Sequence, residues 1–207
     1  MKRTQLKYVF ALLLLIVVTT AAAGTYVLAR GISARDEPSA AEAFIARRLR
    51  HFAIPRRARN LTNPVKATPE VLAAATAHFA DHCASCHGND GRGATLLGRG
   101  LYPKPPDMTA AETQRLTDGA LYYIIENGIR FTGMPGFGEE ADNDSDAESW
   151  DLVHFIRHLP QMTDDEIAAM KQLNPKSPLE IEKEERIRKF LEGDDSQPPE
   201  VSHEHHH

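Results

Sequence analysis

Cysteine is scarce in this sequence, with two residues among 207, and tryptophan occurs once. Cysteine-rich zinc sites usually need two cysteine pairs, and only one pair is present. The sequence also contains no phosphate-binding glycine-rich motif, no nucleophile elbow and no nucleic-acid signature. These absences argue against nucleotide-binding, serine-hydrolase and nucleic-acid-binding functions. They leave the single cysteine pair as the strongest indicator of chemistry.

The two cysteines lie three positions apart in Cys83-Ala84-Ser85-Cys86-His87. A histidine directly after such a pair is the arrangement used for covalent attachment of a c-type haem. The two thiols can reach the two vinyl groups on one porphyrin edge, and the next residue then lies under the iron. We therefore predict one haem c, held by thioethers to Cys83 and Cys86, with His87 as the proximal axial ligand.

Three other interpretations of the cysteine pair are weaker. A zinc site would have to recruit His78 and His82, which lie one helical turn apart. A thioredoxin-like redox pair belongs in a βαβ setting, whereas helix precedes this motif and a glycine-rich loop follows it. A disulfide closing so small a loop would gain little entropy. The two histidines are then either ordinary polar side chains or a second metal site.

Residues 8–29 contain no charged side chain over 22 positions, which corresponds to roughly 33 Å of helix. This length spans a membrane and exceeds the apolar region of most cleavable signal peptides. We predict an uncleaved anchor, with cleavage near residues 21–24 as the alternative. Basic residues on both sides leave the orientation open. Because haem c is attached outside the cytoplasm, we expect residues 30–207 on the periplasmic side of a bacterial inner membrane.

Charge is segregated along the chain, whose formal net charge is −5. Residues 30–66 hold nine Lys/Arg against three Asp/Glu, whereas residues 67–160 hold six against fourteen. Within the basic segment, residues 38–52 place apolar side chains such as Phe44 and Leu49 at helical spacing between arginines. This pattern predicts an amphipathic helix. It lies either on anionic lipid or on the haem domain.

Capping residues and apolar stripes predict the elements that follow. The prolines in residues 54–69 predict an extended linker. Thr68 caps a helix that runs to the haem motif and turns Phe79 toward the core. Residues 88–108 hold glycines and then prolines, which predicts an irregular loop. A carbonyl of this proline region is expected to accept the second ring N–H of His87.

The second half of the predicted domain supplies a methionine. Thr117 caps a helix over residues 118–127, and Gly133-Met134-Pro135 follows it. A methionine among small and turn-forming residues can bring its thioether to an iron, so we predict Met134 as the sixth ligand. The alternative is that Met134 only packs and that a histidine or an open position completes the iron.

Two further helices are predicted within residues 161–193, the first opened by a capping box of Thr163 and Glu166. The chain ends in His203-Glu204-His205-His206-His207. This tail is either a disordered solvated end or a weak metal-binding segment.

Together, the motif from Cys83 to His87, the proline-rich stretch and Gly133-Met134-Pro135 before a closing helix resemble the class I c-type cytochromes. The resemblance covers roughly residues 68–160. It implies a small all-α domain whose helices wrap one low-spin haem with histidine and methionine axial ligands. It carries those two roles to His87 and Met134.

The predicted fold is therefore all-α, with a haem domain between a transmembrane helix and two extra helices. Its segments are a cytoplasmic stub and anchor (1–29), a basic helix and linker (30–67), the haem domain (68–160), accessory helices (161–193) and a disordered His-rich tail (194–207).

An iron with both axial positions filled changes oxidation state without binding substrate, so we expect an electron carrier and no enzyme. Its acidic surface favours redox donors and acceptors with a basic docking face. The alternatives are a haem c subunit of a larger oxidase or reductase and a haem-based sensor. The sequence does not name the donor or the acceptor.

Overall fold

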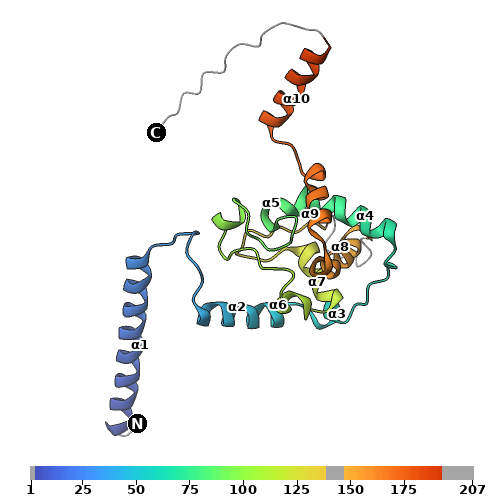
Figure 1. The fold of residues 1–207 in the computed structure, drawn as a ribbon. Coiled ribbons are helices and arrows are strands. Elements are labelled where there is room, and N and C mark those ends of the chain that lie inside the picture. Colours follow the sequence, from blue (N-terminus) through green and yellow to red (C-terminus); the bar gives the residue numbers. More distant parts are fainter. Residues whose placement is uncertain (1–2, 139–146, 193–207) are drawn as a thin grey trace.

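The computed structural model describes residues 3–138 and 147–192, and this part of the chain forms helices and loops without strands (Figure 1). The all-α prediction is confirmed. The predicted tail, residues 194–207, lies outside the described residues. In chain order the elements are α1 (Arg3–Arg30), α2 (Ala40–Ala53), α3 (Arg56–Arg59), α4 (Pro69–His78), the π-helix η1 (Phe79–Cys83), α5 (Ala84–His87), η2 (Gly98–Gly100), α6 (Ala111–Gln114), α7 (Asp118–Asn127), α8 (Ala147–His158), η3 (Leu159–Gln161), α9 (Asp164–Met170), η4 (Lys171–Leu173) and α10 (Pro178–Leu191).

The helices of the domain begin where side chains satisfy their first backbone N–H groups. Thr68 caps α4 and Thr117 caps α7, each by accepting a hydrogen bond from a backbone N–H in the first turn. Thr163 and Glu166 form a complete capping box at the start of α9. At the other end of α7, Gly128 takes a φ of 64°, which terminates the helix. These predicted boundaries are confirmed.

The core lies where α4 crosses α8 and α7 packs beside them. The Trp150 indole stacks on the Tyr122 ring, with ring centroids 4.1 Å apart and planes 11° apart. Phe79 meets Phe155 at a centroid distance of 4.5 Å. All four side chains are buried. Burying each such side chain stabilises the fold by about 1.5–3 kcal/mol.

The segment before α4 is not a simple extended linker. It contains the short helix α3, and Ile54 and Ala58 are buried against Ala120 of α7. The Asn63 side-chain amide donates a 2.9 Å hydrogen bond to the Trp150 carbonyl oxygen of α8. The backbone at Gly119 approaches Ala58 so closely that a Cβ there would collide with its carbonyl oxygen. The linker prediction was wrong because these contacts join positions far apart in sequence.

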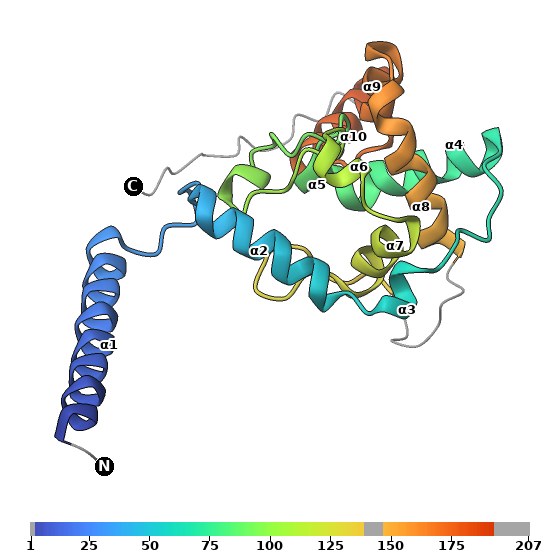
Figure 2. The ribbon, with the colours of Figure 1, turned by 90° about the horizontal axis from the view of Figure 1, so that it is seen from below.

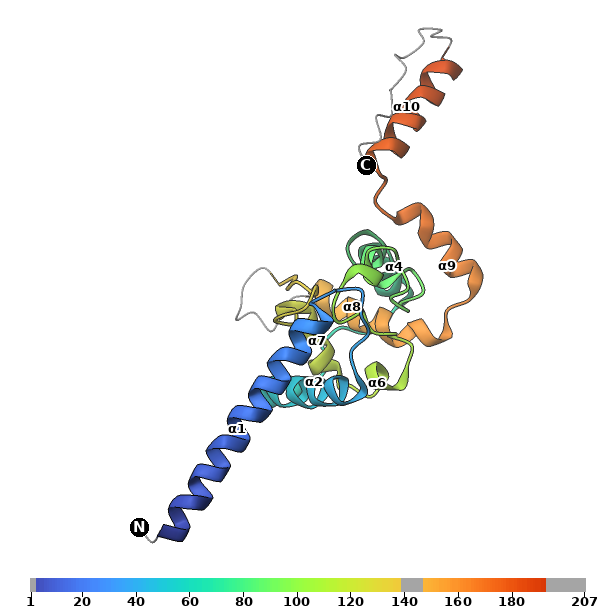
Figure 3. The ribbon, with the colours of Figure 1, turned by 90° about the vertical axis from the view of Figure 1, so that its left-hand side faces the viewer.

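Two helices project from this domain. Within the described residues, Gln5–Ala29 is the helical segment long and apolar enough to cross a membrane, and none of its most apolar stretch is buried. It belongs to α1, which stands apart from the domain in Figure 1. At the other end, α9 is fastened by Met170, which is 1% exposed in the main core. Beyond it, α10 extends away from the domain (Figure 3).

Candidate haem site

The cysteine motif lies at the end of a helix that changes its winding. α4 passes into the π-helix Phe79–Cys83, and α5 then carries the motif to its end at His87. A π-turn is rare and frequently occurs at functional sites. Gly88 follows with a φ of 74°, so the chain leaves the helix directly after the histidine. The π-turn is a feature that sequence periodicity did not predict.

The His87 ring is buried, with 7% of the residue exposed. Burial lowers the pKa of His87 to about 4, so the imidazole is neutral at physiological pH. Its Nδ1 atom is buried and has no hydrogen-bond partner among the described residues. The predicted bond from this ring to a proline-region carbonyl is therefore not formed. A neutral, buried imidazole can hold an iron through one ring nitrogen.

The two cysteines are half-buried, and neither is in a disulfide. Burial, together with the neighbouring Cys86, raises the pKa of the Cys83 thiol to about 12. This thiol is therefore protonated at neutral pH. Dithiol redox chemistry needs a thiolate, so the environment of Cys83 does not favour it. A pair of sulfurs followed by a neutral imidazole fits covalent attachment of haem c.

The glycine-rich loop after the motif is tied to the motif's backbone. The Gly93 N–H donates to the His87 carbonyl oxygen at 2.7 Å, and the Thr95 hydroxyl donates to the Cys86 carbonyl oxygen at 3.0 Å. Gly93 has a φ of 73°, and a Cβ at this position would lie 2.5 Å from the Pro105 carbonyl oxygen. Only glycine fits this close approach. The proline-rich stretch thus packs directly onto the loop that follows His87.

Met134 lies on a tight turn after α7. The Met134 carbonyl oxygen accepts a 3.1 Å hydrogen bond from the Ile129 N–H, and the Met134 N–H donates to the Thr132 hydroxyl at 3.1 Å. The Phe137 N–H returns to the Ile125 carbonyl oxygen of α7 at 3.0 Å. The residue is half-buried. The turn fixes the backbone of Met134 relative to α7, whereas Met108 and Met170 are buried in the core.

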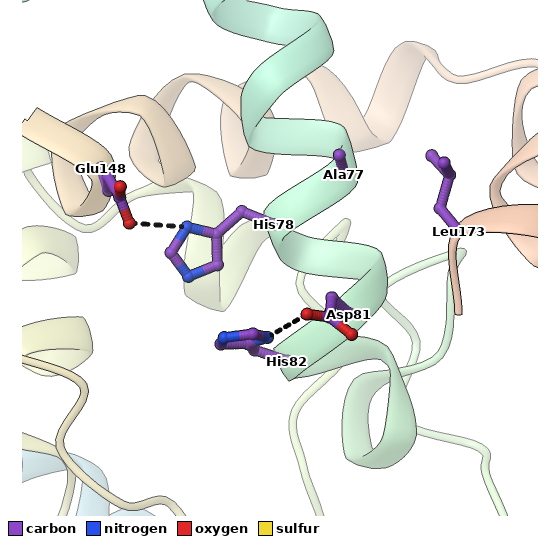
Figure 4. Close-up of a pocket in the computed structure, with 6 residues that line it drawn as sticks. All are labelled: Ala77, His78, Asp81, His82, Glu148 and Leu173. Atoms are coloured by element: carbon purple, nitrogen blue, oxygen red, sulfur yellow. Dashed lines mark ion pairs between the residues drawn. The ribbon is translucent and has the colours of Figure 1, made fainter. Parts of the chain in front are cut away.

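His78 and His82 lie one turn apart, with ring centroids 4.9 Å apart (Figure 4). The His78 Nδ1 atom is 3.4 Å from a Glu148 carboxylate oxygen, and the His82 Nδ1 atom is 3.0 Å from an Asp81 carboxylate oxygen. Within the described residues, no group of three or more His, Cys, Asp or Glu side chains is arranged to hold a metal ion. The zinc interpretation that combined these histidines with the cysteines therefore has no support in this geometry.

A polar clamp that the sequence analysis missed holds α8 against the segment leading into α7. The Arg157 guanidinium donates to an Asp118 carboxylate oxygen at 2.7 and 2.9 Å and to the Gln114 carbonyl oxygen at 2.7 Å. The Gln114 side chain in turn donates to the Met108 and Ile156 carbonyl oxygens at 2.6 and 2.9 Å. Apart from the Gln114–Met108 pair, six residues apart, the partners are about 40 residues apart, so no local pattern indicates them.

Comparison with known proteins places this geometry in a family. Residues 70–156 match the family model described as cytochrome c oxidase, cbb3-type, subunit III. The comparison with curated proteins gives no match. Among solved structures, a chain of the Kuenenia stuttgartiensis reducing HAO-like protein complex Kustc0457/Kustc0458 is 25% identical, with a TM-score of 0.42. The alignment covers 48% of this chain and 49% of that chain, about half the length of each.

The family match begins at the second residue of α4 and ends inside α8, so it contains the cysteine motif, the glycine-rich loop and the Met134 turn. The predicted resemblance to c-type cytochromes is confirmed over this region. Proteins of this kind bind haem c through covalent bonds. Residues 70–156 of this protein are therefore a c-type cytochrome domain.

Proposed function

We propose that this protein is a membrane-tethered carrier of single electrons with one haem c. In this proposal Cys83 and Cys86 form the thioethers, and His87 and Met134 are the axial ligands. The observation that carries the proposal is the buried, neutral His87 imidazole directly after the cysteine pair. The fixed turn at Met134 supports the second ligand.

The bound haem would supply a one-electron iron couple. The protein's own residues then decide which reactions that iron can enter. With His87 and Met134 as the residues that hold the iron, no coordination position would remain open, so neither substrate nor gas would bind there. Thioether sulfur favours the ferrous state, and burial of the site disfavours the extra ferric charge. We therefore propose electron transfer without catalysis.

The proposed location is the outer face of a bacterial inner membrane. The apolar segment Gln5–Ala29 is long enough to span the bilayer. The chemistry of haem c attachment, which takes place outside the cytoplasm, supports a periplasmic haem domain. The family is named for an oxidase subunit, but the match is limited to residues 70–156. Retention of the protein in an isolated oxidase or reductase complex would favour the fixed-subunit alternative over a carrier.

An optical spectrum of the protein matured with haem tests the proposal directly. We expect a low-spin c-type spectrum with the red sulfur-to-iron band in the oxidised form. Carbon monoxide should leave the reduced spectrum unchanged, because Met134 fills the sixth position. A high-spin spectrum that shifts with carbon monoxide would instead indicate a sensor or gas-binding protein. Absence of covalent haem would refute the proposal.

A further inference from the structure

The helix α2 carries an apolar stripe that nothing in the described chain covers. Phe44, Ile45, Leu49 and Phe52 are 54%, 56%, 63% and 72% exposed, and α2 has no buried residue. At about 100° per residue, these four side chains share one face of the helix. Large apolar side chains gathered on an exposed face indicate an interaction surface.

The opposite face of α2 is directed at the haem domain. Ala43 and Arg50 are half-buried and lie about half a turn from the centre of the apolar stripe. Between this face and the apolar stripe, next to Leu49, a Glu42 carboxylate oxygen accepts a 2.5 Å hydrogen bond from the Tyr102 hydroxyl. Figures 1 and 2 show α2 running along one side of the domain. The apolar stripe therefore faces away from the domain.

One arginine lies within the stripe and another lies beside it: around the helix, Arg48 falls between Phe44 and Phe52, and Arg47 is about 60° beyond Phe44. Arg47 and Arg48 are exposed, and the Arg48 guanidinium lies 5.2 Å from the centroid of the Phe44 ring. An arginine in this position can keep its charge at a polar boundary while its stem covers apolar surface. The surrounding segment, residues 30–66, has nine Lys/Arg and three Asp/Glu. Apolar anchors beside arginines are typical of helices that lie in the headgroup region of anionic membranes.

The position of α2 in the chain favours lipid over a second protein. Residues 31–39 join α1 to α2, and nine extended residues reach at most about 32 Å. The helix has 14 residues, or about 21 Å, and carries arginines, so it is too short and too charged to span a bilayer. A second copy of the chain would bring arginines against arginines. An anionic bilayer offers apolar chains and negative charge together, close to the predicted anchor.

We propose that α2 lies flat in the headgroup layer of an anionic membrane, with its apolar stripe toward the acyl chains and the haem domain on its other face. This inference rests on the proposed membrane anchor. It adds a second attachment that sets which side of the haem domain faces the bilayer.

The test uses the full-length, haem-loaded protein in lipid nanodiscs. Because thioethers consume both native cysteines, a fluorophore attached at Ile45→Cys labels the apolar stripe alone. The matched control is Ala46→Cys, one residue further and about 120° from the centre of the stripe. Unsubstituted holoprotein should take up no label. Brominated acyl chains then report contact with the bilayer interior by quenching.

We expect several-fold stronger quenching at Ile45→Cys than at Ala46→Cys in discs with anionic lipid. Adding Arg47→Gln and Arg48→Gln, or raising the salt concentration, should weaken the quenching at Ile45→Cys. Equal quenching at the two positions, or no quenching at either, would overturn the inference. Fluorophore self-quenching that requires two copies of the protein per disc would also overturn it, because a second copy would then cover the stripe. Equal quenching in neutral discs would overturn the requirement for anionic lipid.

The haem spectrum and retention in the disc separate this inference from the proposed function. A protein that stays in the disc with a native c-type spectrum, yet shows no quenching at position 45, contradicts only the role of α2. A protein that is not retained in the disc contradicts the membrane anchor itself.

Discussion

At the scale of single residues, the unpartnered Nδ1 atom of His87 carries an energetic cost. A buried polar atom without a hydrogen bond costs about 1–3 kcal/mol. The Nδ1 atom of His87 is in this condition within the described structure, and burial also holds the ring neutral. Haem that occupies the site would add apolar core to a domain of limited size. The residues around the motif are thus arranged for the holoprotein.

The substitution Met134→Ala tests the second axial ligand. We expect loss of the red sulfur-to-iron band, binding of carbon monoxide by the reduced form, and a lower reduction potential. The shift should be on the order of 100 mV, a fraction of the roughly 0.8 V that axial ligands span. Spectroscopy and a redox titration measure both effects. Met170→Leu is the control, because Met170 is buried in the core and should keep the native spectrum. An unchanged spectrum in Met134→Ala would exclude this ligand.

The substitution Gly93→Ala tests the loop that follows the haem motif. An alanine would need a positive φ and would press its Cβ against the Pro105 carbonyl oxygen. We expect a loss of about 2 kcal/mol or more in the free energy of unfolding, measured by denaturant titration of the holoprotein. Gly100→Ala is the matched control, since a Cβ at Gly100 meets no atom within 4 Å. Equal stability of the two variants would contradict this account.

At the scale of elements, a feature could be predicted from the sequence where it depends on neighbouring residues. It could not be predicted where it depends on contacts between distant residues. The caps at Thr68, Thr117 and Thr163 involve neighbours three residues away, so the pattern alone indicates them. The Arg157 clamp joins α8 to Asp118, 39 residues away, and no local pattern encodes it. The helix α3 was missed for the same reason, because its burial depends on α7.

The capping box of α9 predicts a dependence of local stability on pH. The backbone N–H and hydroxyl of Thr163 donate to the Glu166 carboxylate, and these bonds lower the pKa of Glu166 below its usual value of 4.5. The folded helix therefore favours the ionised form. Its contribution is complete above the unfolded pKa and is lost as pH falls through the lower folded pKa.

We expect protection of the α9 amides from hydrogen exchange, corrected for intrinsic rates, to fall as the pH decreases below the usual glutamate pKa of 4.5. In Glu166→Gln the side chain no longer titrates, so this fall should be absent. The same pH dependence in both proteins would show that another group controls α9.

At the scale of the whole molecule, charge is divided between two consecutive segments of the chain. Residues 30–66 are basic, whereas residues 67–160 hold fourteen Asp/Glu against six Lys/Arg. The basic part adjoins the predicted anchor, and the acidic part carries the haem motif. A redox partner that approaches the haem domain therefore meets a negative field, which favours a positively charged docking face.

This field predicts how electron transfer responds to salt. The rate of reduction by a basic protein donor should fall by about tenfold or more between low and physiological ionic strength, because salt screens steering. Stopped-flow kinetics measures the rate, and a small uncharged reductant is the control. A rate with the protein donor that is indifferent to salt would rule out steering by the acidic surface.

The contacts of Ile54, Ala58 and Asn63 with α7 and α8 also determine how far the haem can travel. Because they fix the segment after α2 to the domain, residues 31–39 are the tether of the proposed membrane-anchored protein, and the Lys104 ammonium donates a 2.9 Å hydrogen bond to the Ala34 carbonyl oxygen within it. A short tether confines the haem to a thin layer over the bilayer, where its effective concentration toward a membrane-bound partner is in the millimolar range. Encounter with such partners then depends on their density in the membrane, and a soluble partner gains nothing from the tether.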